Sequence, residues 1–103
     1  MSAPTVELLY FEGCPNVEAV RELVHRVAAD EGITSNLRLV EVTPEDAERL
    51  RFLGSPSVRV NGHDVEPGAD LRERFVFACR VYRTHTGFSG QPAREWVRAA
   101  LTA

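Results

Sequence analysis

The sequence lacks the features that mark several broad classes of protein. It contains no apolar run long enough to span a bilayer, no internal repeat and no low-complexity segment. Basic residues never gather in a block and the net charge is −3, so we expect neither nucleic acid nor a membrane as partner. The opening residues show neither the basic nor the apolar region of a signal peptide, which favours a cytoplasmic protein.

Several kinds of functional site are missing as well. The chain has no glycine-rich phosphate loop, no Ser-His-Asp arrangement and no pair of carboxylates in a perturbing environment. The three histidines, His25, His63 and His85, are scattered, and we expect all of them to be solvated. Nothing supplies the four closely spaced ligands of a structural zinc site. We therefore predict no metal site and no cofactor.

Cysteine is scarce, with Cys14 and Cys79 as the only two. In a reducing compartment, two cysteines are more often reactive or metal-binding than joined in a permanent disulfide. The prediction of function therefore depends on where the fold places these two thiols.

What is present is the pattern of one α/β domain over residues 1–103. The stretch VELLYF (6–11) is apolar on both alternations and predicts a strand covered on both faces. Apolar residues then recur at helical spacing over 17–28, and Pro15 suits the first turn of that helix. Cys14 is thereby predicted at the helix N-terminus, at or beside the N-cap.

A second strand and helix follow in the same order. Residues 37–42 predict a strand, and Thr43 and Pro44 suit the N-cap and first position of a short helix that ends at Gly54. This order predicts a parallel β-α-β unit with a right-handed crossover. Strands over 57–60 and 63–66 then flank an Asn-Gly pair, which is a strong hairpin signal.

The segment 67–90 is harder to interpret. Its apolar residues from Leu71 to Tyr82 follow helical spacing and predict a helix over 71–82, although FVFACRVY also fits a strand. Residues 84–90 have the composition of a loop. Pro92 then suits the first position of a closing amphipathic helix that runs to Leu101.

Two segments, FEGCPNV (11–17) and GSPSVRVNG (54–62), resemble the thioredoxin superfamily, nearest its glutaredoxin-like members. The chain is also similar to small actinobacterial-type proteins of this kind, some of which carry an alkylmercury-lyase or mercury-resistance label. The resemblance implies a thioredoxin-like β-α-β-α-β-β-α fold, with a parallel first unit, a β-hairpin, and 67–90 as an insertion before the last helix.

The resemblance also assigns roles to single residues. Cys14 matches the nucleophilic cysteine of the family, and Pro15 follows it in the substrate groove. Pro56 matches the cis proline, and Ser55 matches the residue whose backbone pairs with an extended thiol substrate. Val17 stands where the second cysteine of the family's motif is expected, so disulfide exchange between positions 14 and 17 is excluded.

The reactivity of Cys14 also follows from its predicted position. Free N–H groups and the dipole at a helix N-terminus favour the thiolate, which is the nucleophile. Cys79 resolves an intermediate on Cys14 only if the inserted segment folds back over this helix, since a disulfide needs Cα atoms within about 7 Å. The alternatives are that each cysteine is a small buried side chain. Arg80 and Arg83, which flank the second cysteine, either stabilise a thiolate or are ordinary charged residues.

Three hypotheses of function follow. The first is a thiol-disulfide oxidoreductase or thiol-transfer protein that acts on a thiol- or disulfide-containing protein or small molecule. The second is a binding protein for a soft metal such as Hg(II), which accepts two sulfur ligands in linear geometry. The third is a thioredoxin-fold interaction module without catalysis. The oligomeric state stays open.

Overall fold

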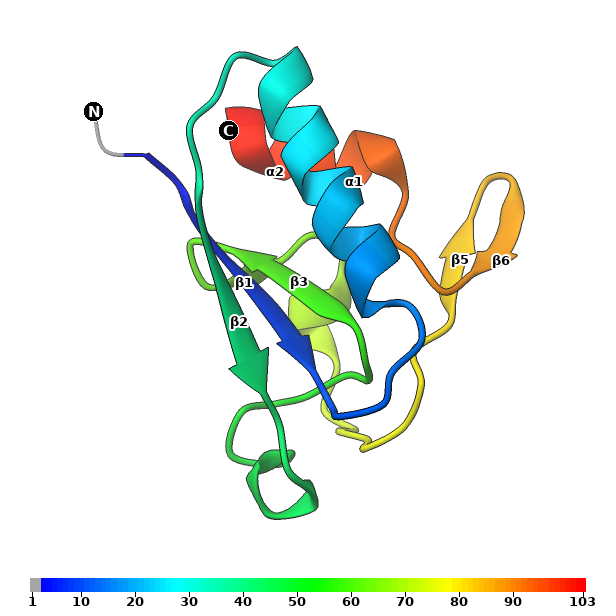
Figure 1. Ribbon diagram of the computed structural model, residues 1–103. Helices are drawn as coiled ribbons and strands as arrows, with labels where there is room; N and C mark the ends of the chain where they lie inside the picture. The colour runs from blue at the N-terminus through cyan, green and yellow to red at the C-terminus, as the bar shows by residue number, and fades with distance from the viewer. Residues whose placement is uncertain (1–2) are drawn as a thin grey trace.

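A four-stranded mixed sheet lies at the centre of the computed structural model, which describes residues 3–103 (Figure 1). Strand β1 (Thr5–Tyr10) pairs in parallel with β2 (Asn36–Glu41) and antiparallel with β3 (Ser57–Val60). Strand β4 (His63–Asp64) pairs antiparallel with β3, so the order across the sheet is β2-β1-β3-β4. The predicted parallel first unit and the predicted antiparallel hairpin are both confirmed.

Strand β1 contributes side chains to both faces of the sheet, as its apolar alternations predicted. Val6 and Leu8 join a core with helices α1 (Val17–Asp30) and α2 (Arg94–Thr102), which lie together on one face (Figure 1). Leu9 joins a second, smaller core on the other alternation. The members of that second core are Leu9, Val42, Ala47 and Phe52, with Phe11, Val40 and Leu50 packed against them.

The Asn-Gly turn forms as expected between β3 and β4. Asn61 and Gly62 both have positive φ, at 52° and 87°, which is the geometry of a type I′ hairpin. The Asn61 side chain also accepts a hydrogen bond from the backbone of Thr5 at 3.1 Å. The turn therefore fixes the register of the hairpin and holds the start of β1.

The predicted helix over 44–53 is wrong. Only the 3₁₀-helix η1 (Pro44–Asp46) forms, followed by turns. The chain reverses at Arg51, which has a φ of 55°, and the Phe52 N–H donates to Ala47 O at 2.8 Å. The reversal brings Phe52 fully into the second core. A continued helix would have to give up that burial, and its apolar stripe is too short to compensate.

The predicted helix over 71–82 is also wrong. After the 3₁₀-helix η2 (Ala69–Leu71) the chain is irregular up to the hairpin of β5 (Tyr82–Thr84) and β6 (Gly87–Ser89). Backbone groups of Val76, Ala78 and Arg80 bond to a distant loop instead of to each other in a helix. The closing helix is confirmed as α2, but Ala93 is its N-cap, so Pro92 precedes the helix rather than occupying its first position.

Within residues 3–103 no helix has the length and apolar character needed to cross a membrane. Residues 1 and 2, which belong to the opening segment interpreted above, lie outside the described part of the chain.

Candidate functional site

The loop after β1 holds the first cysteine. Gly13 has a φ of 88°, and the Cys14 N–H donates to Phe11 O at 3.2 Å, so a tight turn sets the cysteine in place. Cys14 is a half-buried free thiol. The N-cap of α1 is Asn16, so Cys14 and Pro15 both precede the helix. The prediction that placed Pro15 in the first turn is therefore wrong, and Cys14 lies outside the turn where the helix dipole acts most strongly.

The second part of the site is the loop before β3. The Ser55–Pro56 peptide bond is cis, as the sequence predicted, and both residues are buried. The Ser55 hydroxyl accepts a hydrogen bond from the Phe11 N–H at 3.2 Å. One hydrogen bond therefore joins the loop that carries Cys14 to the loop that carries the cis proline.

Residues 76–82, which we call the strap, lie along this second loop. The Val76 N–H donates to Phe52 O at 2.9 Å, the Ser55 N–H donates to Ala78 O at 2.9 Å, and the Arg80 N–H donates to Ser55 O at 2.8 Å. The last two bonds make a parallel bridge between Ser55 and Cys79. The strap is thus held against the cis-proline loop by an isolated β-bridge.

The strap that carries Cys79 contacts the loop that carries Cys14. The ring of Phe77 lies 5.1 Å from the ring of Phe11, measured between centroids. Phe11 is also the residue that accepts the Cys14 N–H and donates to the Ser55 hydroxyl. Cys79 is an exposed free thiol, so the alternative of a buried core cysteine is wrong. Phe11 and Ser55 therefore link the loop that carries Cys14 to the strap that carries Cys79.

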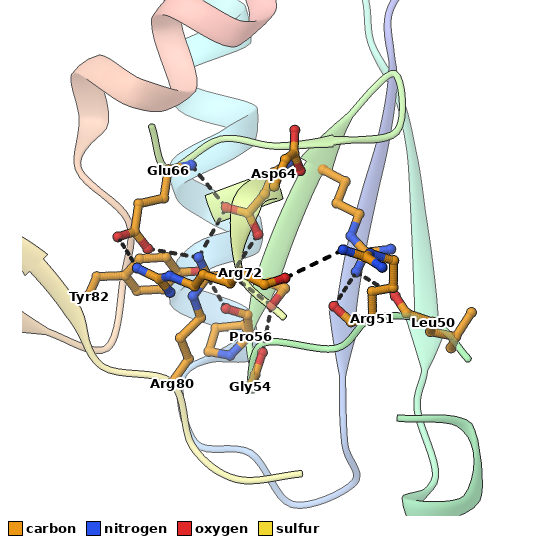
Figure 2. Close-up of polar contacts among 12 residues, drawn as sticks. Leu50, Arg51, Gly54, Pro56, Asp64, Glu66, Arg72, Arg80 and Tyr82 are labelled. Atoms are coloured by element: carbon orange, nitrogen blue, oxygen red, sulfur yellow. Dashed lines mark hydrogen bonds and ion pairs between the residues drawn. The ribbon is translucent and has the colours of Figure 1, made fainter. Parts of the chain in front are cut away.

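Arg80 anchors the strap in a buried ionic cluster (Figure 2). Its guanidinium bonds both carboxylate oxygens of Asp64, at 2.7 and 3.0 Å, and one oxygen of Glu66 at 2.8 Å. It also donates to the Ser57 hydroxyl at 2.9 Å. Burial alone would lower the pKa of Arg80, but the hydrogen bonds and charges of its partners outweigh burial and hold the pKa above its ordinary value.

This cluster decides whether Arg80 is available to stabilise a thiolate. The Arg80 side chain is only 2% exposed, and both of its terminal nitrogens are taken by Asp64, Glu66 and Ser57. Arg80 is therefore a structural anchor, and its predicted role in stabilising a thiolate is wrong. Arg83 is exposed on β5, as an ordinary charged residue would be.

Tyr82 ends the strap and contacts the cis proline. Its hydroxyl donates to Pro56 O at 2.6 Å, and its ring lies under the Arg80 guanidinium at 4.3 Å (Figure 2). Burial raises the pKa of Tyr82 well above its ordinary value, because a charged phenolate would lose its contact with water; the positive charge of Arg80 opposes this shift only in part. Tyr82 was predicted as one position of a helical stripe, and its contact with Pro56 was missed.

Two glycines allow residues 67–90 to pack closely against the cis-proline loop and the start of α1. A Cβ on Gly54 would lie 2.9 Å from Arg80 Cβ and 3.1 Å from Ala78 O. A Cβ on Gly90 would lie 2.3 Å from the side-chain nitrogen of Asn16, the N-cap of α1. Residues 67–90 are therefore closely packed at these two positions, one at the strap and one at the start of α1.

The remaining predicted residues lie apart from this region or are solvated. Val17 is half-buried and packs against the larger core. His25 is exposed, and His63 and His85 are 79% and 71% exposed, which confirms that all three are solvated. His63 and His85 each lie beside a carboxylate, Asp70 at 3.0 Å and Glu95 at 2.9 Å. Among residues 3–103, no three His, Cys, Asp or Glu side chains gather in a metal-binding group.

Comparison of the chain with known protein families and with curated proteins gave no match. The chemistry of the site therefore has to be argued from its own residues. A free thiol can react with a disulfide, and two thiols that meet can form a disulfide or bind a soft cation together. The sequence singled out both thiols and the Ser55–Pro56 loop. It missed the strap, Arg80 as an anchor and Tyr82, although an arginine inside the apolar run FACRVY was a signal.

Proposed function

We propose that this protein is a thiol-disulfide redox or thiol-transfer protein, in which Cys14 is the nucleophile and Cys79 the resolving thiol. The observation that carries the proposal is the connection of both cysteines through Phe11 and Ser55. Phe11 O accepts the Cys14 N–H, Phe11 N–H donates to Ser55, and Ser55 bridges to Cys79. Cys79 would thus supply the second sulfur that Val17 does not.

A thioredoxin-like fold is part of the same proposal. The strand order β2-β1-β3-β4, with β1 and β2 parallel and β3 and β4 antiparallel, supports it. So does the position of Cys14 between β1 and α1, with the cis Pro56 directly before β3. The helix that the family has between the second and third strands is reduced here to η1 and turns.

The proposed reaction proceeds in two exchanges. The Cys14 thiolate attacks one sulfur of a disulfide, forms a mixed disulfide and expels the other half as a thiolate. The Cys79 thiolate then attacks Cys14 Sγ, which forms a Cys14–Cys79 disulfide and expels the second half. The substrate disulfide is reduced by two electrons while the two protein thiols are oxidised. Two molecules of an external thiol then reduce the Cys14–Cys79 disulfide by two further exchanges and leave as their own disulfide.

The test is to titrate the reduced protein with 2-hydroxyethyl disulfide and follow the products by intact mass spectrometry. The wild-type protein should end as an internal disulfide that has lost two hydrogens and carries no adduct. Cys79→Ser should stop at a mixed disulfide on Cys14. Cys14→Ser should react far more slowly. A wild-type protein that keeps both thiols free, or a Cys14→Ser variant that reacts as fast, would reject the proposal.

The same two thiols also suit a soft cation. Thiolates are soft ligands, and two of them suffice for linear coordination of Hg(II). Stoichiometric Hg(II) binding lost in either single variant, without any disulfide exchange, would favour this second function. Unchanged Hg(II) binding in Cys14→Ser would exclude it.

A further inference from the structure

The backbone of Ser55 has no free hydrogen-bonding group. Its N–H donates to Ala78 O and its C=O accepts from the Arg80 N–H, and its hydroxyl is engaged by the Phe11 N–H. An extended peptide gains much of its affinity by adding a strand to backbone groups that lack partners. At this loop the strap already occupies the place beside the Ser55 backbone that an added peptide strand would take.

The strap is held too firmly to be displaced at little cost. Its far end carries the buried ion pairs of Arg80 with Asp64 and Glu66, and the hydrogen bond of Tyr82 to Pro56. Breaking a buried ion pair leaves an unpaired buried charge, which is strongly unfavourable. Its near end is held by the hydrogen bond of Val76 and by the ring of Phe77 against Phe11 and Phe52.

The two ends of the strap differ in exposure. Arg80 and Tyr82 are buried, whereas Val76 and Phe77 are 39% and 40% exposed. Cys14 and Cys79 both keep access to solvent. A small molecule can therefore approach the thiols from solvent without moving the strap, while a peptide that needs the Ser55 backbone cannot.

We propose that the strap determines substrate class, restricting the site to low-molecular-weight disulfides and excluding extended peptide disulfides. This inference rests on the proposed thiol function and adds to it the kind of substrate. The residues that set the specificity are Ser55 and the two strap residues that bond its backbone N–H and C=O, Ala78 and Arg80.

The experiment compares two disulfides on the same reduced protein. One is 2-hydroxyethyl disulfide, and the other is an extended peptide with a central cysteine in a mixed disulfide with 2-mercaptoethanol. The rate of loss of the Cys14 thiol is measured for both by quenched alkylation and mass spectrometry. The wild-type protein should react with the small disulfide at least about tenfold faster, which corresponds to about 1.4 kcal/mol.

Phe77→Ala is the informative variant, because it loosens the exposed end of the strap and leaves the Arg80 cluster intact. It should raise the rate with the peptide, relative to the rate with the small disulfide, by about tenfold, again about 1.4 kcal/mol. Phe88→Ala removes a 77% exposed ring on β6, outside the strap, and is the matched control that should change neither rate. Circular dichroism of each variant establishes that it is folded.

The outcomes separate the two proposals. Equal rates with both disulfides in the wild-type protein, with Cys14 modified in each case, would overturn the substrate restriction and leave the thiol function standing. A Phe77→Ala variant that is folded and shows no gain with the peptide would also overturn the restriction. If Cys14 reacts with neither disulfide, the thiol function itself is rejected, and the substrate restriction with it.

Discussion

At the scale of single residues, the Tyr82 hydroxyl stabilises the cis-proline loop through Pro56. Its hydrogen bond to Pro56 is buried, so Tyr82→Phe leaves that carbonyl without its partner. We expect a loss of about 1–3 kcal/mol in the free energy of unfolding at neutral pH. Urea denaturation measures this loss, and Tyr10→Phe, at a half-buried position on β1, is the control for removing a tyrosine hydroxyl elsewhere.

The raised pKa of Tyr82 predicts a dependence of stability on alkaline pH. Because the folded state holds the phenolic proton more tightly, this stabilisation is complete below the unfolded pKa of about 10 and is lost as the pH rises above it. The free energy of unfolding of the wild-type protein should therefore fall between about pH 10 and 12. Tyr82→Phe should show a shallower fall, and an equally steep one would contradict this assignment.

Arg80 is the residue whose loss should cost most. Replacing it by methionine leaves Asp64 without its cation, and the Asp64 side chain is only 3% exposed, whereas Glu66 keeps its ion pair with Arg72. We expect Arg80→Met to lower the free energy of unfolding by about 3–5 kcal/mol. Arg80→Lys should recover part of this, because an ammonium keeps the charge but cannot match both oxygens of Asp64.

The control for this change is Arg83→Met, three positions along and exposed on β5. Its effect on urea denaturation should stay within about 0.5 kcal/mol. Similar losses at both positions would show that charge in the insertion, and not the buried cluster, accounts for the stability.

At the scale of elements, Gly54 controls how the strap meets the cis-proline loop. Gly54→Ala adds a methyl group 2.9 Å from Arg80 Cβ at a φ of 114°, so the strap must shift. Gly68→Ala places alanine at a φ of 81° with no atom within 4 Å, which reproduces the backbone strain without the crowding. We expect Gly54→Ala to be less stable and to expose Cys79 to faster alkylation, and Gly68→Ala to lose stability alone.

Elements with local signals were predictable from the sequence. Strand β1 followed from its apolar alternations, and the β3–β4 hairpin followed from Asn61 and Gly62. The strap could not be predicted, because its backbone partners lie on a loop more than 20 positions earlier in the chain. The spacing of Leu71 to Tyr82 fits a helix, but Leu71 is 85% exposed and the ion pairs of Arg80 determine the course of the chain instead.

At the scale of the whole molecule, a Cys14–Cys79 disulfide would close a loop of 65 positions. In the chain-entropy account, a crosslink over such a loop stabilises the folded state by about 4 kcal/mol. The oxidised protein should therefore resist urea more than the reduced one by about this amount. The difference should vanish in Cys79→Ser, and an oxidised protein less stable than the reduced one would show that the two thiols do not meet without strain.

The Arg80 cluster also affects how the molecule responds to heat. The cost of removing charged groups from water falls as temperature rises, because their hydration carries an unfavourable entropy, while apolar burial gains little further. The strap is held at its buried end by ion pairs, and the sheet is held by aliphatic side chains. On warming, the ion pairs that hold the strap therefore become more stabilising relative to the apolar core. We expect the strap to keep extended peptides from Ser55 up to the temperature at which the whole domain melts.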